Sequence, residues 1–123
     1  MEAPRVLVVD DDKYIRDILE KALVLAGFNV ETASDGASAL KLCRTFLPHV
    51  VLLDVIMPDL SGIETLQRIR EMDKDVKVVM VSGMHDLQMA KEAIILGAVD
   101  YITKPFDLRD LDNYLHSIIN GAI

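Results

Sequence analysis

The hydrophobic residues of this 123-residue chain fall into five short runs, and a segment with helical spacing follows each run. The runs occupy residues 6–9, 28–33, 50–53, 76–81 and 98–102. In the segments between them, apolar residues recur every three or four positions, which is the spacing of one helix face. This alternation predicts five strand–helix units. It therefore predicts a parallel sheet with helices on both faces, since right-handed crossovers are the rule.

The composition of the runs predicts their order in the sheet. The runs at 6–9, 50–53 and 78–81 are nearly all apolar, as strands buried on both faces are. Those at 28–33 and 98–102 alternate or carry a charge, which is typical of edge strands. We therefore expect an α/β, flavodoxin-like (βα)5 fold. It is a doubly wound parallel sheet with strand order 2-1-3-4-5, in one domain over residues 1–123.

Local signals predict several helix ends. Asp12, Ser61 and Asp107 are expected to cap the N-termini of helices, because a short polar side chain there can accept a backbone N–H. Gly27 and Gly97 are expected to end helices, and the helix before Gly97 is predicted over about residues 85–96.

Charge and cysteine content narrow the class of protein. Thirteen Lys and Arg against twenty Asp and Glu give a formal net charge of −7, which argues against nucleic acid as a direct partner. Cys43 is the single cysteine and is expected to pack as a small apolar group. The apolar runs are too short to span a bilayer, and the first residues lack a signal-peptide core. We expect a soluble, cytoplasmic protein without a membrane partner, on which Arg16 and Arg70 belong to solvated faces.

Three carboxylates are predicted to meet at one edge of the sheet. Asp10 and Asp11 follow the first strand, and Asp54 follows the third. In the predicted order these two strands flank the switch point, where open α/β sheets bind ligands. Oxygen ligands without His or Cys suit Mg²⁺. The alternative for Asp54, taken by itself, is a residue that starts a turn.

Two further polar groups end neighbouring strands. Ser82 ends the fourth strand, and Lys104 lies just beyond the fifth. A hydroxyl and an ammonium facing a Mg²⁺–carboxylate site suit phosphoryl transfer, where charge neutralisation and positioning do most of the catalysis. An aspartate can itself be the nucleophile and become an aspartyl phosphate. Ser82 as an ordinary turn residue is the alternative.

Five motifs together resemble the receiver domain of two-component response regulators, over essentially the whole chain. They are 8–12 (VVDDD), 53–58 (LDVIMP), 81–83 (VSG), 96–98 (LGA) and 101–106 (YITKPF). Each motif is weak alone, but five in order at strand ends are specific. Because the chain ends about where the fifth helix would, it looks like the stand-alone members, such as the chemotaxis regulator and the sporulation phosphorelay intermediate.

The resemblance implies a role for each matching residue around the metal. Asp54 matches the phosphoacceptor, which takes a phosphoryl group from a phosphohistidine on a sensor histidine kinase or a phosphotransfer protein. Asp10 and Asp11 match the acidic pair that holds Mg²⁺, for which Mn²⁺ is a substitute. The backbone carbonyl of Ile56 matches the third protein contact to the metal, beside the phosphoacceptor itself.

The resemblance also implies a switch. Lys104 matches the lysine that pairs with the phosphoryl oxygens, and its peptide bond to Pro105 would be cis. Ser82 matches the hydroxyl that moves toward the phosphoryl group, and Tyr101 matches the aromatic that then turns inward. The surface formed by the fourth helix, the fifth strand and the fifth helix would change as a result. A static aromatic on an edge strand is the alternative for Tyr101.

The chain departs from more polar family examples beside the reacting carboxylate. Ile56 and Met84 stand two residues after Asp54 and Ser82, where they would flank the path of a hydrolytic water. Neither side chain can orient a water by hydrogen bonding, so we expect slow self-dephosphorylation. His85 is near enough in sequence to tune the loop after Ser82.

Other functions stay open at this point. The second is an aspartyl-phosphate phosphatase, but such enzymes usually carry another aspartate two residues after the first, where Ile56 stands. A third is a binding module that has lost phosphorylation. The fourth is the N-terminal receiver fragment of a larger transcriptional regulator. Tyr14, Ile15 and Ile18 are candidates for a kinase-docking patch. We expect a phosphoacceptor rather than an enzyme, and a monomer, with dimerisation on phosphorylation left open.

Overall fold

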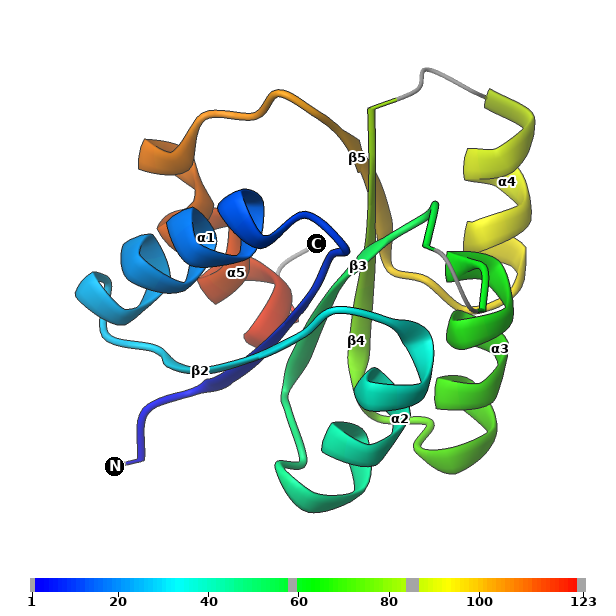
Figure 1. Cartoon of the computed structure of the whole chain (residues 1–123), viewed down its shortest axis with the longest axis horizontal. Helices are drawn as coiled ribbons and strands as arrows, with labels where there is room; N and C mark the ends of the chain where they lie inside the picture. Colours follow the sequence, from blue (N-terminus) through cyan, green and yellow to red (C-terminus); the bar gives the residue numbers. More distant parts are fainter. Residues whose placement is uncertain (1, 58–59, 84–86, 122–123) are drawn as a thin grey trace.

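The computed structural model describes residues 2–57, 60–83 and 87–121, and it forms a central sheet between two layers of helices (Figure 1). The strands are β1 (Arg5–Val9), β2 (Asn29–Ala33), β3 (Val50–Asp54), β4 (Lys77–Ser82) and β5 (Asp100–Thr103). The helices are α1 (Lys13–Leu25), α2 (Gly36–Thr45), α3 (Gly62–Met72), α4 (Leu87–Ile95) and α5 (Leu108–Ile119). Among these, no helix is long and apolar enough to cross a membrane.

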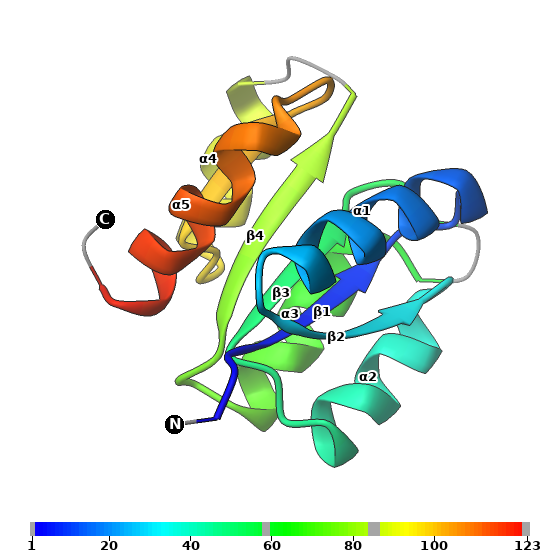
Figure 2. The ribbon, with the colours of Figure 1, turned by 90° about the vertical axis from the view of Figure 1, so that its left-hand side faces the viewer.

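The strand order is β2-β1-β3-β4-β5 and every pair is parallel, which confirms the predicted fold. Helices α1 and α5 cover one face and α2, α3 and α4 cover the other, as Figures 1 and 2 show from two directions. Alternate residues of each inner strand enter the two cores: Leu7 and Val9 face α2 to α4, whereas Val6 and Val8 face α1 and α5. Because both faces are buried, the inner strands have no polar residue between their first and last positions.

The predicted caps are present. The side chains of Asp12, Ser61 and Asp107 accept the N–H groups of Tyr14, Glu64 and Arg109 at 2.9, 3.1 and 2.9 Å. Each bond satisfies an N–H that a helix start leaves without an intrahelical partner. Cys43 is buried in α2, as predicted, and burial raises the pKa of its thiol to about 11.

Two predictions about the second half of the chain need correction. Strand β5 begins at Asp100 rather than residue 98, because the N–H of Ala98 bonds to Ala93 of α4 across the turn at Gly97. Arg70 is not a solvated side chain. Its guanidinium donates to the carbonyls of Val76 at 2.5 Å and Lys74 at 2.6 Å, and it packs against Gly97 so closely that a Cβ there would lie 2.9 Å from Nε.

Candidate functional site

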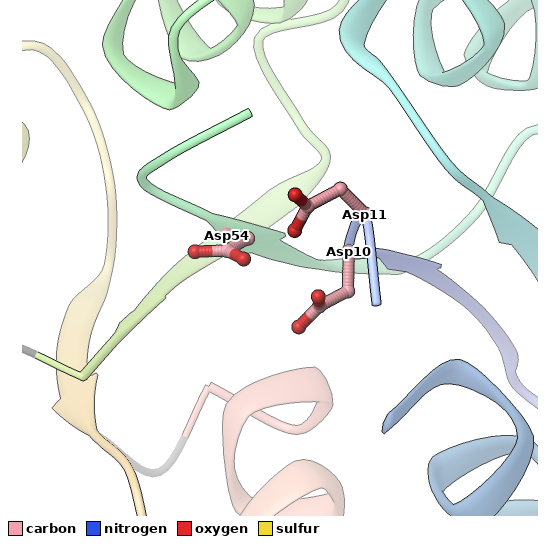
Figure 3. A group of neighbouring side chains, drawn as sticks. All are labelled: Asp10, Asp11 and Asp54. Carbon is pink, nitrogen blue, oxygen red and sulfur yellow. The ribbon is translucent and has the colours of Figure 1, made fainter. Parts of the chain in front are cut away.

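Asp10, Asp11 and Asp54 come together at the carboxyl edge of the sheet (Figure 3). Asp54 is the last residue of β3 and Asp10 follows the last residue of β1, and these strands pair through Val9 and Leu53. One carboxylate oxygen from each of the three residues lies within 4.8 Å of the others. Asp10 and Asp54 are only 3% and 8% exposed, whereas Asp11 faces solvent. The structure therefore concentrates negative charge where the predicted switch point lies.

Lys104 brings a positive charge to the same place. Its Nζ lies 2.8 Å from Oδ2 of Asp10 and 3.6 Å from Oδ2 of Asp54. Its backbone N–H donates to the carbonyl of Ser82 at 2.7 Å, so the segment after β5 is tied to the end of β4. The peptide bond between Lys104 and Pro105 is cis, as predicted. The ammonium of Lys104 thus contacts two buried carboxylates.

The pKa values of the site follow from this crowding. Burial raises the pKa of the Asp54 carboxyl, and the negative charge of Asp10 raises it further. The Lys104 ammonium and a hydrogen bond from the Ile56 N–H, at 3.2 Å, act in the opposite direction without cancelling the rise. For Lys104, burial alone would lower the pKa, but its hydrogen bond to Asp10 and the Asp54 charge outweigh burial and raise it. The site therefore favours additional positive charge.

The donor set fits a hard divalent cation. All three groups offer carboxylate oxygens, and no His or Cys is among them. Their oxygens lie within 4.8 Å of one another, which is close enough for a single ion to be shared among the three residues. This cluster of three aspartates could thus hold a metal ion.

The structure also places Ser82, Tyr101 and Ile56. Ser82 ends β4 beside Thr103 of β5 and is 1% exposed. Tyr101 lies in β5 opposite Met80 and packs against the core under α2 to α4. The side chain of Ile56 is 60% exposed at the mouth of the site. Met84 and His85, which the sequence placed near the site, lie outside the described residues.

Sequence reasoning missed the role of Arg16. Arg16 was expected on a solvated face, but its Nη1 donates to the backbone carbonyl of Asp10 at 2.7 Å. Helical spacing puts residue 16 one turn after Asp12, close to the loop that carries the acidic pair. No pattern in the sequence indicates the direction in which this long side chain points.

An apolar cavity of about 250 Å³ adjoins the site between α1 and the segment after β5. Ile15 and Ile18 line it together with Phe106 and the stem of Lys104. Tyr14 is 70% exposed and is not part of the lining. Two residues of the predicted docking patch therefore share one surface with Lys104.

Comparison with known proteins identifies the family. The model of the response regulator receiver domain matches residues 6–116. The chain is 41% identical to a probable transcriptional regulator (ycf27) of Guillardia theta, over 94% of the chain and 45% of the relative. It is 41% identical to the transcriptional regulatory protein PrrA of Mycobacterium leprae, over 90% of the chain and 48% of the relative. The chain thus spans about half the length of these curated relatives.

A solved structure agrees with this result. The CheY-like receiver domain protein of Methanospirillum hungatei superposes with a TM-score of 0.93 at 29% identity, covering 98% of this chain and 96% of that one. The predicted resemblance is thereby confirmed, and the fold and the position of the acidic cluster agree with it. The chain belongs to the response regulator receiver domain family.

Proposed function

We propose that the chain accepts a phosphoryl group onto Asp54 from a phosphohistidine of a sensor histidine kinase or a phosphotransfer protein. The observation that carries this proposal is the buried carboxylate of Asp54, which lies at a strand end with Asp10, Asp11 and Lys104 around it. Family membership supports the same donor, because receiver domains act with phosphodonors of this kind.

The transfer is a displacement at phosphorus. A carboxylate oxygen of Asp54 forms the new P–O bond while the P–N bond to the donor imidazole breaks, and the bonding electron pair returns to the imidazole nitrogen. The product is an acyl phosphate on Asp54. Lys104, within 3.6 Å of the carboxylate, offsets charge on the phosphoryl oxygens. Asp10, Asp11, Asp54 and the Ile56 carbonyl would hold a Mg²⁺ or Mn²⁺ ion, which would supply further charge neutralisation.

The signal would leave through the surface of α4, β5 and α5. The Lys104 N–H donates a hydrogen bond to the carbonyl of Ser82, which is the last residue of β4. A movement of Lys104 would therefore also displace the end of β4. Tyr101 borders an open hollow of about 460 Å³ beside α4. In this proposal, phosphorylation pulls Ser82 inward, Tyr101 follows, and the surface recognised by a downstream protein or a second copy changes.

Intact-mass measurement after incubation with acetyl phosphate tests the proposal. We expect a Mg²⁺-dependent gain of one phosphoryl mass in the native protein, no gain in Asp54→Asn, and a normal gain in Asp35→Asn, which alters an α2 cap instead. Absence of any gain, even from a phosphorylated histidine donor, would contradict the proposal. Continuous phosphate release without a lasting adduct would favour the aspartyl-phosphate phosphatase.

The curated relatives favour one alternative for the wider role. Both are regulators of transcription, and the chain covers less than half of each. A receiver with the same chemistry could therefore be the N-terminal part of a larger transcriptional regulator. In that case the proposed phosphorylation of Asp54 would control the activity of the rest of that protein.

A further inference from the structure

The backbone carbonyl of Asp10 accepts a hydrogen bond from a side chain rather than from a neighbouring strand. The β1 ladders end at Val9, while Asp10 itself is 3% exposed. Its N–H donates to the carbonyl of Ala33 at 3.1 Å, but its carbonyl accepts a bond of 2.7 Å from the guanidinium of Arg16. A buried carbonyl without a partner is costly, so this bond stabilises one particular course of the chain after β1.

Arg16 reaches this carbonyl from an electrostatically unfavourable position. It is the fourth residue of α1, and its own N–H donates to the Asp12 carbonyl in the first turn. The N-terminus of a helix carries partial positive charge and favours acids over bases. The contact with the Asp10 carbonyl offsets this, and it holds the guanidinium in the turn between β1 and α1.

Among the described residues, four contacts hold Asp10. Besides the two at its backbone, Oδ1 of Asp10 accepts the N–H of Asp12 at 2.9 Å, and Oδ2 accepts Nζ of Lys104 at 2.8 Å. Within this set, Arg16 and Lys104 are the two residues that contact Asp10 through their side chains, and Arg16 is the one that binds its backbone. The direction of the adjacent Asp10 and Asp11 carboxylates in Figure 3 depends on this turn.

We propose that Arg16 is a positioning residue for the divalent cation. By holding the Asp10 carbonyl, it sets the turn in which Asp10 and Asp11 both reach toward Asp54, and it thereby sets the affinity for Mg²⁺. This inference rests on the proposed function, since it assigns a residue to the same metal site. A role through charge alone predicts the opposite effect, because removing a cation beside a Mg²⁺ site strengthens metal binding.

Calorimetric titration of the full chain with MgCl₂ separates the two roles. We expect Arg16→Met to raise the dissociation constant for Mg²⁺ about tenfold, the usual size for loss of a group that orients a metal ligand. Arg16→Lys keeps one donor and the charge, and it should recover part of the affinity. The matched control is Lys13→Met. It also removes a cation from the start of α1, but this cation pairs with Asp17 at 2.7 Å. It should bind Mg²⁺ at least as well as the native protein.

Amide hydrogen exchange in Mg²⁺-free buffer adds a readout that does not depend on the metal. Arg16→Met should exchange faster at Asp11 and Asp12 while the strands keep their protection. Circular dichroism spectra identify a temperature at which every variant is folded. If Arg16→Met does not fold, Arg16→Lys is compared with the native protein instead. Unchanged or tighter Mg²⁺ binding in Arg16→Met, or in Arg16→Lys where only that variant folds, would overturn the inference while phosphorylation of the native protein still stands. Failure of the native protein to bind Mg²⁺ and to accept phosphate would instead overturn the proposed function.

Discussion

The two edges of the sheet use polar groups in opposite ways. At the amino edge, Arg5 donates from Nε to the carbonyl of Leu47 at 2.8 Å, and Nδ1 of His49 accepts the Arg5 N–H at 2.9 Å. Arg70 donates to two carbonyls of the loop before β4. At the carboxyl edge, three carboxylates lie together, and two of them pair with the ammonium of Lys104.

The difference separates groups that stabilise the fold from groups that serve a ligand. At the amino edge, the guanidinium groups of Arg5 and Arg70 donate to backbone carbonyls and so hold neighbouring loops in place. The carboxyl edge holds like charges together in a buried place, which costs stability and leaves an affinity for cations. Substitutions at the amino edge should therefore change the free energy of unfolding, and those at the carboxyl edge should change phosphorylation.

The largest effect is expected for Lys104→Met. Without this ammonium, the buried carboxylates of Asp10 and Asp54 lose the cation that both contact, and the phosphoryl oxygens lose their charged partner. We expect phosphoryl uptake from acetyl phosphate to slow by roughly 100-fold or more. The free energy of unfolding in Mg²⁺-free buffer should fall by about 3 kcal/mol. Intact-mass time courses and urea denaturation measure the two effects.

Lys77→Met, at the start of the neighbouring strand, is the control for Lys104→Met. It removes a lysine from the amino edge and should leave the uptake rate unchanged. Equal rates in native protein and Lys104→Met would show that the carboxylates alone govern transfer.

Arg70→Met is expected to have the next largest effect, and on stability alone. It removes two charged hydrogen bonds to the carbonyls of Val76 and Lys74, which should lower the free energy of unfolding by about 2 kcal/mol. Arg68→Met, two residues earlier and exposed, should change it by less than about 0.5 kcal/mol. Urea denaturation gives both values, and mass spectrometry should show native phosphoryl uptake. A slower phosphoryl uptake in Arg70→Met would show that residues of the amino edge also affect phosphorylation.

Asp54→Asn should stabilise the protein. Burial and the Asp10 charge raise the pKa of Asp54 in the folded state, so its ionised form destabilises the fold at neutral pH. Removing that charge should add about 1 kcal/mol at pH 7 in Mg²⁺-free buffer, the usual size of a single substitution but of opposite sign.

The pH dependence of this gain gives a second check. As pH falls through the raised pKa, the folded native protein binds the proton before the unfolded chain does, so the native protein recovers stability. The advantage of Asp54→Asn should therefore shrink on acidification and level off below the ordinary aspartate pKa. Urea denaturation of both proteins at a series of pH values measures it. An advantage that grew on acidification would mean that ionised Asp54 stabilises the fold.

The sequence predicted the strand order and the acidic cluster because both follow from local composition. Continuous apolar runs such as 50–53 are typical of inner strands, and parallel inner strands bring their carboxyl ends to one edge. The caps at Asp12 and Ser61 were equally predictable, since each bond spans two or three residues.

Contacts of long side chains were not predictable in this way. The sequence indicates that Arg16 and Arg70 lie among acids, but their partners are backbone carbonyls. Such bonds depend on where a turn places an acceptor, which composition does not record. The contacts of Lys104 were not predictable either. The structure shows that its Nζ is nearer to Asp10 than to Asp54.

The smallest effect is expected for Ile56→Asn, and it concerns the lifetime of the proposed phosphoryl group. The Ile56 N–H bonds to Asp54 while its side chain is 60% exposed, so the side chain stands at the solvent side of the acceptor without a group that could orient water. An asparagine there can hold a water by one hydrogen bond, worth about 1 kcal/mol, which corresponds to roughly fivefold faster hydrolysis. Decay of the phosphorylated mass after removal of acetyl phosphate measures the rate, with Ile56→Val as the apolar control. Equal lifetimes in all three proteins would mean that water reaches the acyl phosphate by a path that residue 56 does not control. The chemistry of the carboxyl edge would then depend on its charges alone.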